Sequence, residues 1–97
     1  MLYHVTATHA AENCPGYNQD IQTKMLEFTT EAFPKLSVEL KVKVHFIVTP
    51  APEHVVYMLL ETDDFSAVTK LLMACPMQQD FSVKQVSEIV KVAQMSF

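Results

Sequence analysis

Four segments with strand-like alternation are interleaved with only two segments of helical periodicity, and this imbalance constrains the fold most strongly. Residues 2–9 and 39–48 alternate between apolar and polar side chains and are rich in β-branched types, which predicts two strands. A proline-containing turn at 49–53 leads into residues 54–62, a nearly continuous apolar run typical of a central strand. A fourth strand is expected at about 80–87.

Each expected helix begins at a capping residue and ends before a proline. The first is expected over residues 18–33, with Asn18 as its N-cap and Pro34 as its stop. The second begins at Asp63 or Asp64 and ends before the next proline. The apolar residues on the inner faces follow helical spacing: Ile21, Met25, Phe28 and Ala32 in the first helix, and Phe65, Val68, Leu71, Leu72 and Cys75 in the second.

The predicted order, β-α-β-β-α-β, is the split-βαβ or ferredoxin-like arrangement of α+β proteins. Two helices can cover only one face of a four-stranded antiparallel sheet, so the other face must be polar or buried by something else. Residues 1–97 form one domain, because no linker or repeat interrupts them. Residues 88–97 combine helical spacing with the valine and isoleucine content of a strand, and we favour a short helix or an arm that packs on a neighbouring subunit.

Alternation assigns the strand side chains to two faces of the sheet. The helix-covered face is expected to receive Tyr3, Val5, Ala7, Val44, Phe46, Val56, Met58 and Leu60. The open face then carries His4, Thr6, Thr8, Lys43, His45, Ile47, Val55, Tyr57, Leu59 and Glu61. This face is too apolar for water and too polar for a dry core, which is typical of a sheet-to-sheet dimer that encloses a partly polar cavity. We therefore expect a homodimer or a higher homo-oligomer.

Composition narrows the class of ligand. The chain has one glycine, Gly16, which excludes the glycine-rich loops that hold phosphate groups. It has no arginine, so it lacks the bidentate fork that usually recognises phosphate and carboxylate groups. A net charge of −4 argues against nucleic acid as a partner. The expected ligand is a weakly charged or neutral small organic molecule.

The start of the chain and its apolar runs bear on location. The strand-like start carries no signal-peptide pattern, and the longest apolar run, 55–60, is far shorter than the roughly 20 residues of a membrane span. We expect no membrane partner and a cytoplasmic location. In that compartment Cys14 and Cys75, which lack C-x-x-C spacing, are expected to be free thiols.

The open face supplies the candidate catalytic residues. His4 is placed as a general acid or base, and Tyr57 as a hydrogen-bond donor to the substrate. The further ligand-binding candidates on this face are Thr6, Thr8, His45 and Glu61. Each has a structural alternative: a histidine hydrogen-bonded in the interface, a tyrosine ring packed there, or a glutamate in solvent.

The loop at 10–17 and the residue before it supply a second group of candidates. His9, Glu12 and Cys14 place imidazole, carboxylate and thiol groups close together in the chain. His9 and Cys14 are assigned to ligand binding, as part of a loop that lines or gates the pocket. Metal binding is an alternative, although the H-x4-C spacing matches no common zinc motif and other histidines would have to complete the site. No metal ligand and no cofactor is assigned, and His54 is expected to face water.

The N-terminus and the second half of the chain resemble a known superfamily. Met1–Val5 (MLYHV) resembles the start typical of muconolactone isomerases, and an apolar strand that runs into Asp64–Val68 (DFSAV) and Leu71–Met73 (LLM) before Pro76 follows the same plan. With the order of elements and the half-polar face, the chain resembles the dimeric α/β-barrel superfamily, which includes muconolactone isomerases and small cofactor-free antibiotic-biosynthesis-type monooxygenases.

The resemblance implies a homodimer that binds a small aromatic or lactone-like compound. If the protein is an enzyme, the resemblance implies a cofactor-free isomerase or monooxygenase. Residues 41–48 lack the tryptophan- and glycine-containing pattern of the isomerases. A His/Cys metal-binding protein and a non-enzymatic assembly module therefore stay open as alternatives, because a shared fold does not carry a shared activity.

Overall fold

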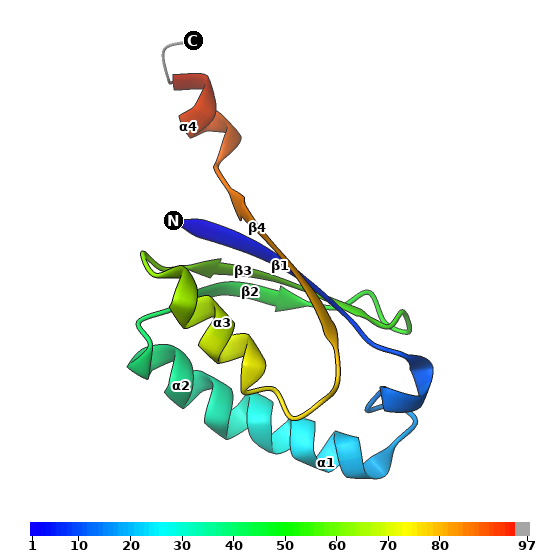
Figure 1. Ribbon diagram of the computed structural model, residues 1–97. Coiled ribbons are helices and arrows are strands. Elements are labelled where there is room, and N and C mark those ends of the chain that lie inside the picture. Colours follow the sequence, from blue (N-terminus) through cyan, green and yellow to red (C-terminus); the bar gives the residue numbers. More distant parts are fainter. Residues whose placement is uncertain (95–97) are drawn as a thin grey trace.

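The computed structural model describes residues 1–94 and has an α+β fold with a four-stranded antiparallel sheet (Figure 1). The strands are β1 (Leu2–Thr8), β2 (Lys43–Val48), β3 (Val55–Glu61) and β4 (Asp80–Val86). The helices are α1 (Gln19–Glu27), α2 (Phe33–Glu39), α3 (Phe65–Met73) and α4 (Ile89–Gln94). A π-helical segment, η2 (Phe28–Ala32), joins α1 to α2 in one long helix, and a short 3-10 helix, η1 (Ala11–Asn13), follows β1.

The sheet has the strand order β2-β3-β1-β4, and each pair of neighbouring strands is antiparallel. The long helix and α3 lie against one face of this sheet (Figure 1). The core between the two layers is apolar, and Val5, Leu60, Val68 and Leu71 are its largest fully buried side chains. The alternation predicted for β1 is confirmed, because Tyr3, Val5 and Ala7 are all buried on the helix-covered side.

The first helix is longer than the sequence predicts, and the expectation that Pro34 ends it is wrong. The Phe33 N–H donates to the Phe28 carbonyl, so the turn before the proline is a π turn. This wider turn changes the hydrogen-bond register where proline has no N–H to donate, and the helix continues. Glu39, the first residue of the predicted strand at 39–48, therefore belongs to α2, and β2 begins only at Lys43. The same turn buries Phe33 against Phe28, with ring centroids 5.6 Å apart, while Ala32 is exposed.

A β-bulge in β2 reverses part of the predicted alternation. The register of β2 against β3 shifts at His45, which is the extra residue of the bulge. Because side chains alternate with a period of two, one inserted residue moves every later side chain to the other face. Phe46 therefore lies on the open face, and Ile47 lies on the helix-covered face beside Met58. The predicted faces of Phe46 and Ile47 were wrong for this reason, whereas His45 keeps its predicted open face.

Both predicted helix caps are present. The Asn18 side chain accepts a hydrogen bond from the Ile21 N–H at 3.2 Å. Of the two candidates for the second cap it is Asp64 that acts, and its carboxylate accepts from the Ser66 N–H at 2.9 Å and from the Ser66 hydroxyl at 2.7 Å. These two bonds lower the pKa of the Asp64 carboxyl. Local hydrogen bonds thus set both helix starts.

The C-terminal segment forms the short helix that the sequence favoured. α4 covers residues 89–94, and residues 95–97 of the predicted tail lie outside the described residues. Figure 1 shows α4 extending away from the sheet, and Ile89 and Val90 are strongly exposed on it. None of the helices within residues 1–94 is long and apolar enough to cross a membrane.

Candidate functional site

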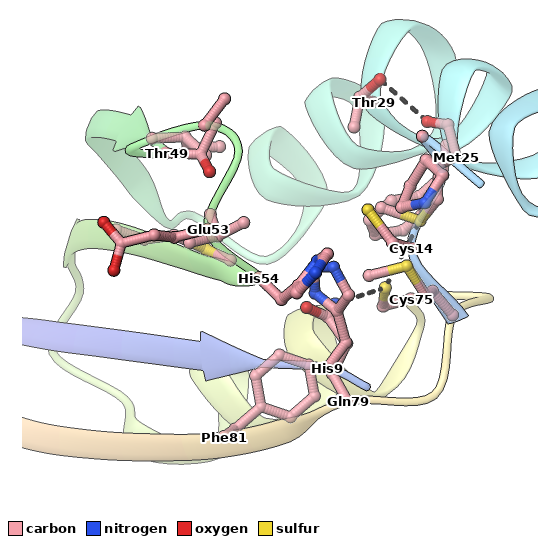
Figure 2. Close-up of a pocket in the computed structure, with 18 of the residues that line it drawn as sticks. His9, Cys14, Met25, Thr29, Thr49, Glu53, His54, Cys75, Gln79 and Phe81 are labelled. Carbon is pink, nitrogen blue, oxygen red and sulfur yellow. Dashed lines mark hydrogen bonds between the residues drawn. The ribbon is translucent and has the colours of Figure 1, made fainter. Parts of the chain in front are cut away.

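A cavity of about 490 Å³ opens between the helix layer and one end of the sheet. Val56 and Met58 contribute from the helix-covered face of β3, Met25 and Phe28 from the long helix, and Leu72 from α3 (Figure 2). The cavity lies on the opposite side of the sheet from the one that the sequence predicts. Residues 14–17, before α1, and residues of the turn before β3 supply much of the rest of its lining.

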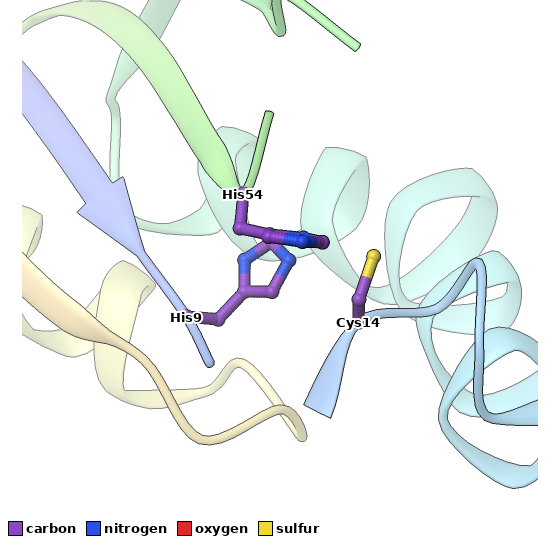
Figure 3. Close-up of side chains that lie close together, drawn as sticks. All are labelled: His9, Cys14 and His54. Atoms are coloured by element: carbon purple, nitrogen blue, oxygen red, sulfur yellow. The ribbon is translucent and has the colours of Figure 1, made fainter. Parts of the chain in front are cut away.

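Imidazole and thiol groups cluster on one side of a largely apolar lining, while Thr29, Thr49 and Glu53 lie apart from them (Figure 2). In this cluster His9, His54 and Cys14 point toward one another, next to the sulfur atoms of Met25 and Cys75 (Figures 2 and 3). Most of the other lining residues carry aromatic, aliphatic or thioether side chains. A pocket with apolar walls and a few convergent polar groups is the common form of a small-molecule site.

Strand pairing brings the two histidines together. His9 directly follows β1 and His54 directly precedes β3, and these strands pair with Thr8 opposite Val55. The His9 N–H extends the pairing by donating to the His54 carbonyl at 3.2 Å. Both side chains then fall on the helix-covered side, in the same alternation as the buried residues of their strands. The expectation that His54 faces water was therefore wrong.

The loop after β1 carries Cys14 back toward the histidines. The Cys14 N–H donates to the Ala11 carbonyl at 3.1 Å, which closes the short 3-10 helix. The Cys14 carbonyl accepts from the N–H groups of Tyr17 and Asn18 at 3.0 and 3.1 Å. Hydrogen bonds on both sides thus hold Cys14 just ahead of α1. Cys14 and His9 both line the 490 Å³ cavity.

The three side chains form a compact cluster. The potential ligand atoms of His9, Cys14 and His54 all lie within 4.8 Å of one another. The two imidazole rings are 5.3 Å apart between centroids and meet edge to face, and the Tyr17 ring lies 5.9 Å from that of His54. His54, which is distant in the chain, thus joins His9 and Cys14, which are five residues apart, at the same point.

Most imidazole nitrogens of this cluster lack a hydrogen-bond partner among the described residues. Both ring nitrogens of His9 and Nδ1 of His54 are buried and have no hydrogen-bond partner among the described residues. Burial, and secondarily the nearby His54, lowers the pKa of His9, which favours its neutral form. A buried polar group without a partner is uncommon in a folded protein and needs an explanation.

A second thiol lies beside the cluster and has partners of its own. The Gln79 side-chain NH₂ donates to Cys75 Sγ at 3.2 Å, and Cys75 Sγ lies 3.7 Å from Met25 Sδ. Cys14 and Cys75 are both free cysteines, as predicted. Cys75 is therefore tied into the wall of the cavity.

The predicted catalytic residues lie near one another on the open face, away from the cavity. The His4 ring lies near those of Tyr57 and Phe46, at centroid distances of 6.0 and 6.5 Å. Thr6 sits directly across from Tyr57, and Thr8 is exposed at the end of the strand. None of these residues lines the 490 Å³ cavity.

His45 and Glu61 form a second pair on the open face. His45 Nε2 lies 2.7 Å from Glu61 Oε1, and both side chains are partly exposed. The hydrogen bond from His45, together with smaller contributions from the charges of His45 and Lys43, lowers the pKa of Glu61. Glu61 is paired with Lys43 in the register of β2 and β3, so the pair joins neighbouring strands beside the bulge.

No protein-family model matches the chain, and a search of curated proteins finds no match. The function must therefore be argued from the chemistry of the site rather than from a relative.

Proposed function

We propose that the protein binds a small, neutral and largely apolar organic molecule in the cavity between the sheet and the long helix. The observation that carries this proposal is a 490 Å³ cavity with mostly apolar walls and a cluster of imidazole and thiol groups. Cavities of about 300–1,000 Å³ suit small organic ligands. Apolar walls supply affinity, and the imidazole and thiol groups of the cluster can orient a hydroxyl or carbonyl group of the ligand.

The charges around the cavity favour a neutral ligand over an anionic one. Glu53 is the only acidic residue in the lining, and none of the lysines in the described residues lines it. An anion would therefore meet a carboxylate and no fixed cation. A neutral aromatic or lactone-like compound would avoid that repulsion and pack against the rings of Phe28, Phe33 and Phe81.

A bulky substitution in the helical part of the lining tests the binding proposal. Thr29 lines the cavity and is exposed on η2, so Thr29→Trp adds a bulky ring at the opening. We expect this variant to weaken binding of a neutral fluorescent aromatic probe, N-phenyl-1-naphthylamine, by at least about tenfold, a loss of about 1.4 kcal/mol. Fluorescence titration measures the affinity.

Thr30→Trp is the matched control. Thr30 is the next residue of the same π-helical segment, is also exposed and makes the same kind of hydroxyl-to-carbonyl bond, but it does not line the cavity. We expect the probe to bind this variant as it binds the wild-type protein. Equal weakening in both variants, or no saturable binding by the wild-type protein, would refute the proposal.

We also propose that the chain has the ferredoxin-like fold and pairs through its open sheet face as a dimeric α/β barrel. The strand order β2-β3-β1-β4, with the helices between strands on one face, supports this fold. Apolar side chains on the other face support the pairing, because Phe46 and Val48 are 39% and 51% exposed there. A second copy of the chain would bury them against its own open face, because a two-fold interface uses the same surface on both subunits.

Sedimentation at micromolar concentration tests the pairing. Leu59 lies in the middle of the open face, so Leu59→Lys should convert a dimer into a monomer. Leu26→Lys is the control, since Leu26 is 64% exposed on the long helix. A wild-type protein that sediments as a monomer, or a Leu26→Lys variant that dissociates equally, would contradict the proposed interface.

A second candidate site is the open face itself, favoured by the adjacency of His4 and Tyr57. In the proposed dimer these side chains would face an enclosed space, where His4 could transfer a proton and the Tyr57 hydroxyl could donate to a developing oxyanion. This is the arrangement that a cofactor-free isomerase or monooxygenase would use. If His4→Ala turns over a panel of lactones and phenols as fast as the wild-type protein does, this candidate is eliminated.

A further inference from the structure

We propose that His9, Cys14 and His54 bind a transition-metal ion of the zinc class, Zn²⁺ above all, with a fourth coordination position open toward the cavity. The inference does not depend on the organic ligand proposed above. It rests on three observations: the geometry of the cluster, the state of its nitrogens, and the way in which the backbone holds it.

The geometry is close to that of a zinc site. The potential ligand atoms lie within 4.8 Å of one another. A tetrahedral Zn²⁺, with bonds of about 2.0–2.1 Å to nitrogen and 2.3 Å to sulfur, holds its ligand atoms about 3.3–3.6 Å apart. The three side chains lie close together (Figure 3), and their ligand atoms would have to approach by at most about 1.5 Å to reach that spacing.

The nitrogens of the cluster need a partner that the described residues do not supply. Both nitrogens of His9 and Nδ1 of His54 are buried without a hydrogen bond. The lone pair of a neutral imidazole is a metal ligand, and a bound ion would satisfy one nitrogen of each ring. Two imidazoles and a thiolate are the borderline and soft donors that zinc-class ions prefer over carboxylate and carbonyl oxygens.

The backbone fixes all three ligands on hydrogen-bonded segments. His9 and His54 are joined by a backbone hydrogen bond at the ends of two paired strands, and Cys14 is bonded on both sides at the start of the long helix. A site built on such elements is more rigid than one carried by a free loop. Because the chain supplies three ligands here, the fourth position faces the cavity, as in catalytic rather than structural zinc sites.

A polar depression adjoins the site. It has a volume of about 280 Å³ and shares His9 and Gln79 with the cavity. Glu12 and Asp80 line this depression, and their carboxylates would raise the local concentration of a hydrated divalent cation.

Cobalt titration of the chelator-treated, reduced protein tests the inference. We expect Co²⁺ to bind with a one-to-one stoichiometry and to produce thiolate-to-cobalt charge-transfer absorption in the near ultraviolet, together with intense visible bands of a four-coordinate ion. Zn²⁺ should abolish both by displacement. The charge-transfer band reports the thiolate directly, so a merely structural role of Cys14 would not produce it.

Matched variants locate the site. Cys14→Ser should lose the charge-transfer band, and His9→Ala and His54→Ala should weaken Co²⁺ binding by more than the roughly 10–100-fold that changes around a metal site cost. Cys75→Ser and His45→Ala should bind as the wild-type protein does, since neither side chain belongs to the cluster. Circular dichroism establishes that each variant is folded.

Several results would overturn the inference. One is a wild-type protein that shows no charge-transfer band at saturating Co²⁺. Another is a band that survives in Cys14→Ser or disappears only in Cys75→Ser. Binding of Cu⁺ without binding of Co²⁺ or Zn²⁺ would refute the proposed class of ion. The Thr29→Trp variant, which blocks the cavity opening, should keep the cobalt spectrum, so the failure of one proposal can be told from the failure of the other.

Discussion

Two groups of histidines lie on opposite faces of the same sheet, and their surroundings differ. On the open face His45 has a carboxylate partner 2.7 Å away, and the His4 ring lies near the rings of Phe46 and Tyr57. On the helix-covered face His9 and His54 have buried ring nitrogens without partners among the described residues. An exposed imidazole can find hydrogen-bond partners in the protein or in water, whereas a buried imidazole without a partner still requires a ligand.

The largest expected effect is the stabilisation of the inner cluster by metal. A free Zn²⁺ concentration of about 100 times the dissociation constant should stabilise the fold by about 2.7 kcal/mol, provided that the unfolded chain does not bind it. For a chain of this size that corresponds to a Tm increase of roughly 10–20 °C. Differential scanning calorimetry with Zn²⁺ and with chelator measures the effect.

Comparing His54→Ala with His45→Ala shows which group of histidines is responsible for the increase in Tm. The inner variant should lose the increase in Tm, and the open-face variant should keep it, because only His54 belongs to the cluster. An increase of equal size in both variants would mean that Zn²⁺ binds elsewhere on the protein.

A smaller effect is expected when an inner histidine becomes apolar in the presence of chelator. His54→Phe keeps an aromatic ring beside Tyr17 and removes the buried, unpartnered Nδ1. Because an unsatisfied buried group costs about 1–3 kcal/mol, we expect the free energy of unfolding to rise by about 1 kcal/mol. His4→Phe on the open face should change it by less than about 0.5 kcal/mol.

Urea unfolding at neutral pH compares these two variants. The wild-type protein, with chelator, provides the reference. A His54→Phe variant that is clearly less stable than the wild-type protein would show that the imidazole is already satisfied, which would erase the difference between the two faces.

The smallest effect concerns the pH dependence of the open-face pair. The pKa of Glu61 is lower in the folded protein than its ordinary value of 4.5, because the carboxylate accepts a hydrogen bond from His45. The unfolded chain therefore binds this proton more readily, so the stabilisation is present above about pH 4.5 and is lost as the pH falls through the folded pKa. Glu61→Gln should lose this part of the acid sensitivity.

Asp64→Asn is the control for that measurement. The pKa of Asp64 is also lowered, by its bonds to Ser66, so its stabilising contribution is lost at acidic pH in the same way. Unfolding curves at a series of pH values separate the two groups, since each variant removes one of them. If Glu61→Gln follows the wild-type pH profile throughout, the open-face pair contributes nothing, and His45 is no better satisfied than the inner histidines.

Part of the inner cluster was visible in the sequence. His9 continues the alternation of Tyr3, Val5 and Ala7, and its inward direction follows from a period of two. His54 lies two residues before Val56, so alternation places it on the same face as the inward residues of β3. The turn before it suggested an exposed strand end. The missed signal was therefore the continuation of a buried face beyond the end of the strand.

The irregular backbone was harder to predict. A proline after a helical pattern usually ends the helix, and only the π turn at Phe28–Ala32 lets Pro34 remain inside it. The bulge at His45 leaves no mark in an alternating sequence, because it is defined by the pairing with β3. Both features depend on contacts between segments, which the local pattern does not contain.

Local sequence pattern predicted the order of the strands and the two main helices, a helix start at Asn18, another at Asp63 or Asp64, and the buried faces of β1 and β3. These depend on neighbouring residues, through capping bonds and side-chain periodicity. The proximity of the His9, Cys14 and His54 side chains depends on the tertiary structure. The reason is that antiparallel pairing aligns the end of β1 with the start of β3, and the position of the long helix brings Cys14 to the same point. Chain spacing carries no information about such a meeting, because strand pairing and helix packing create it.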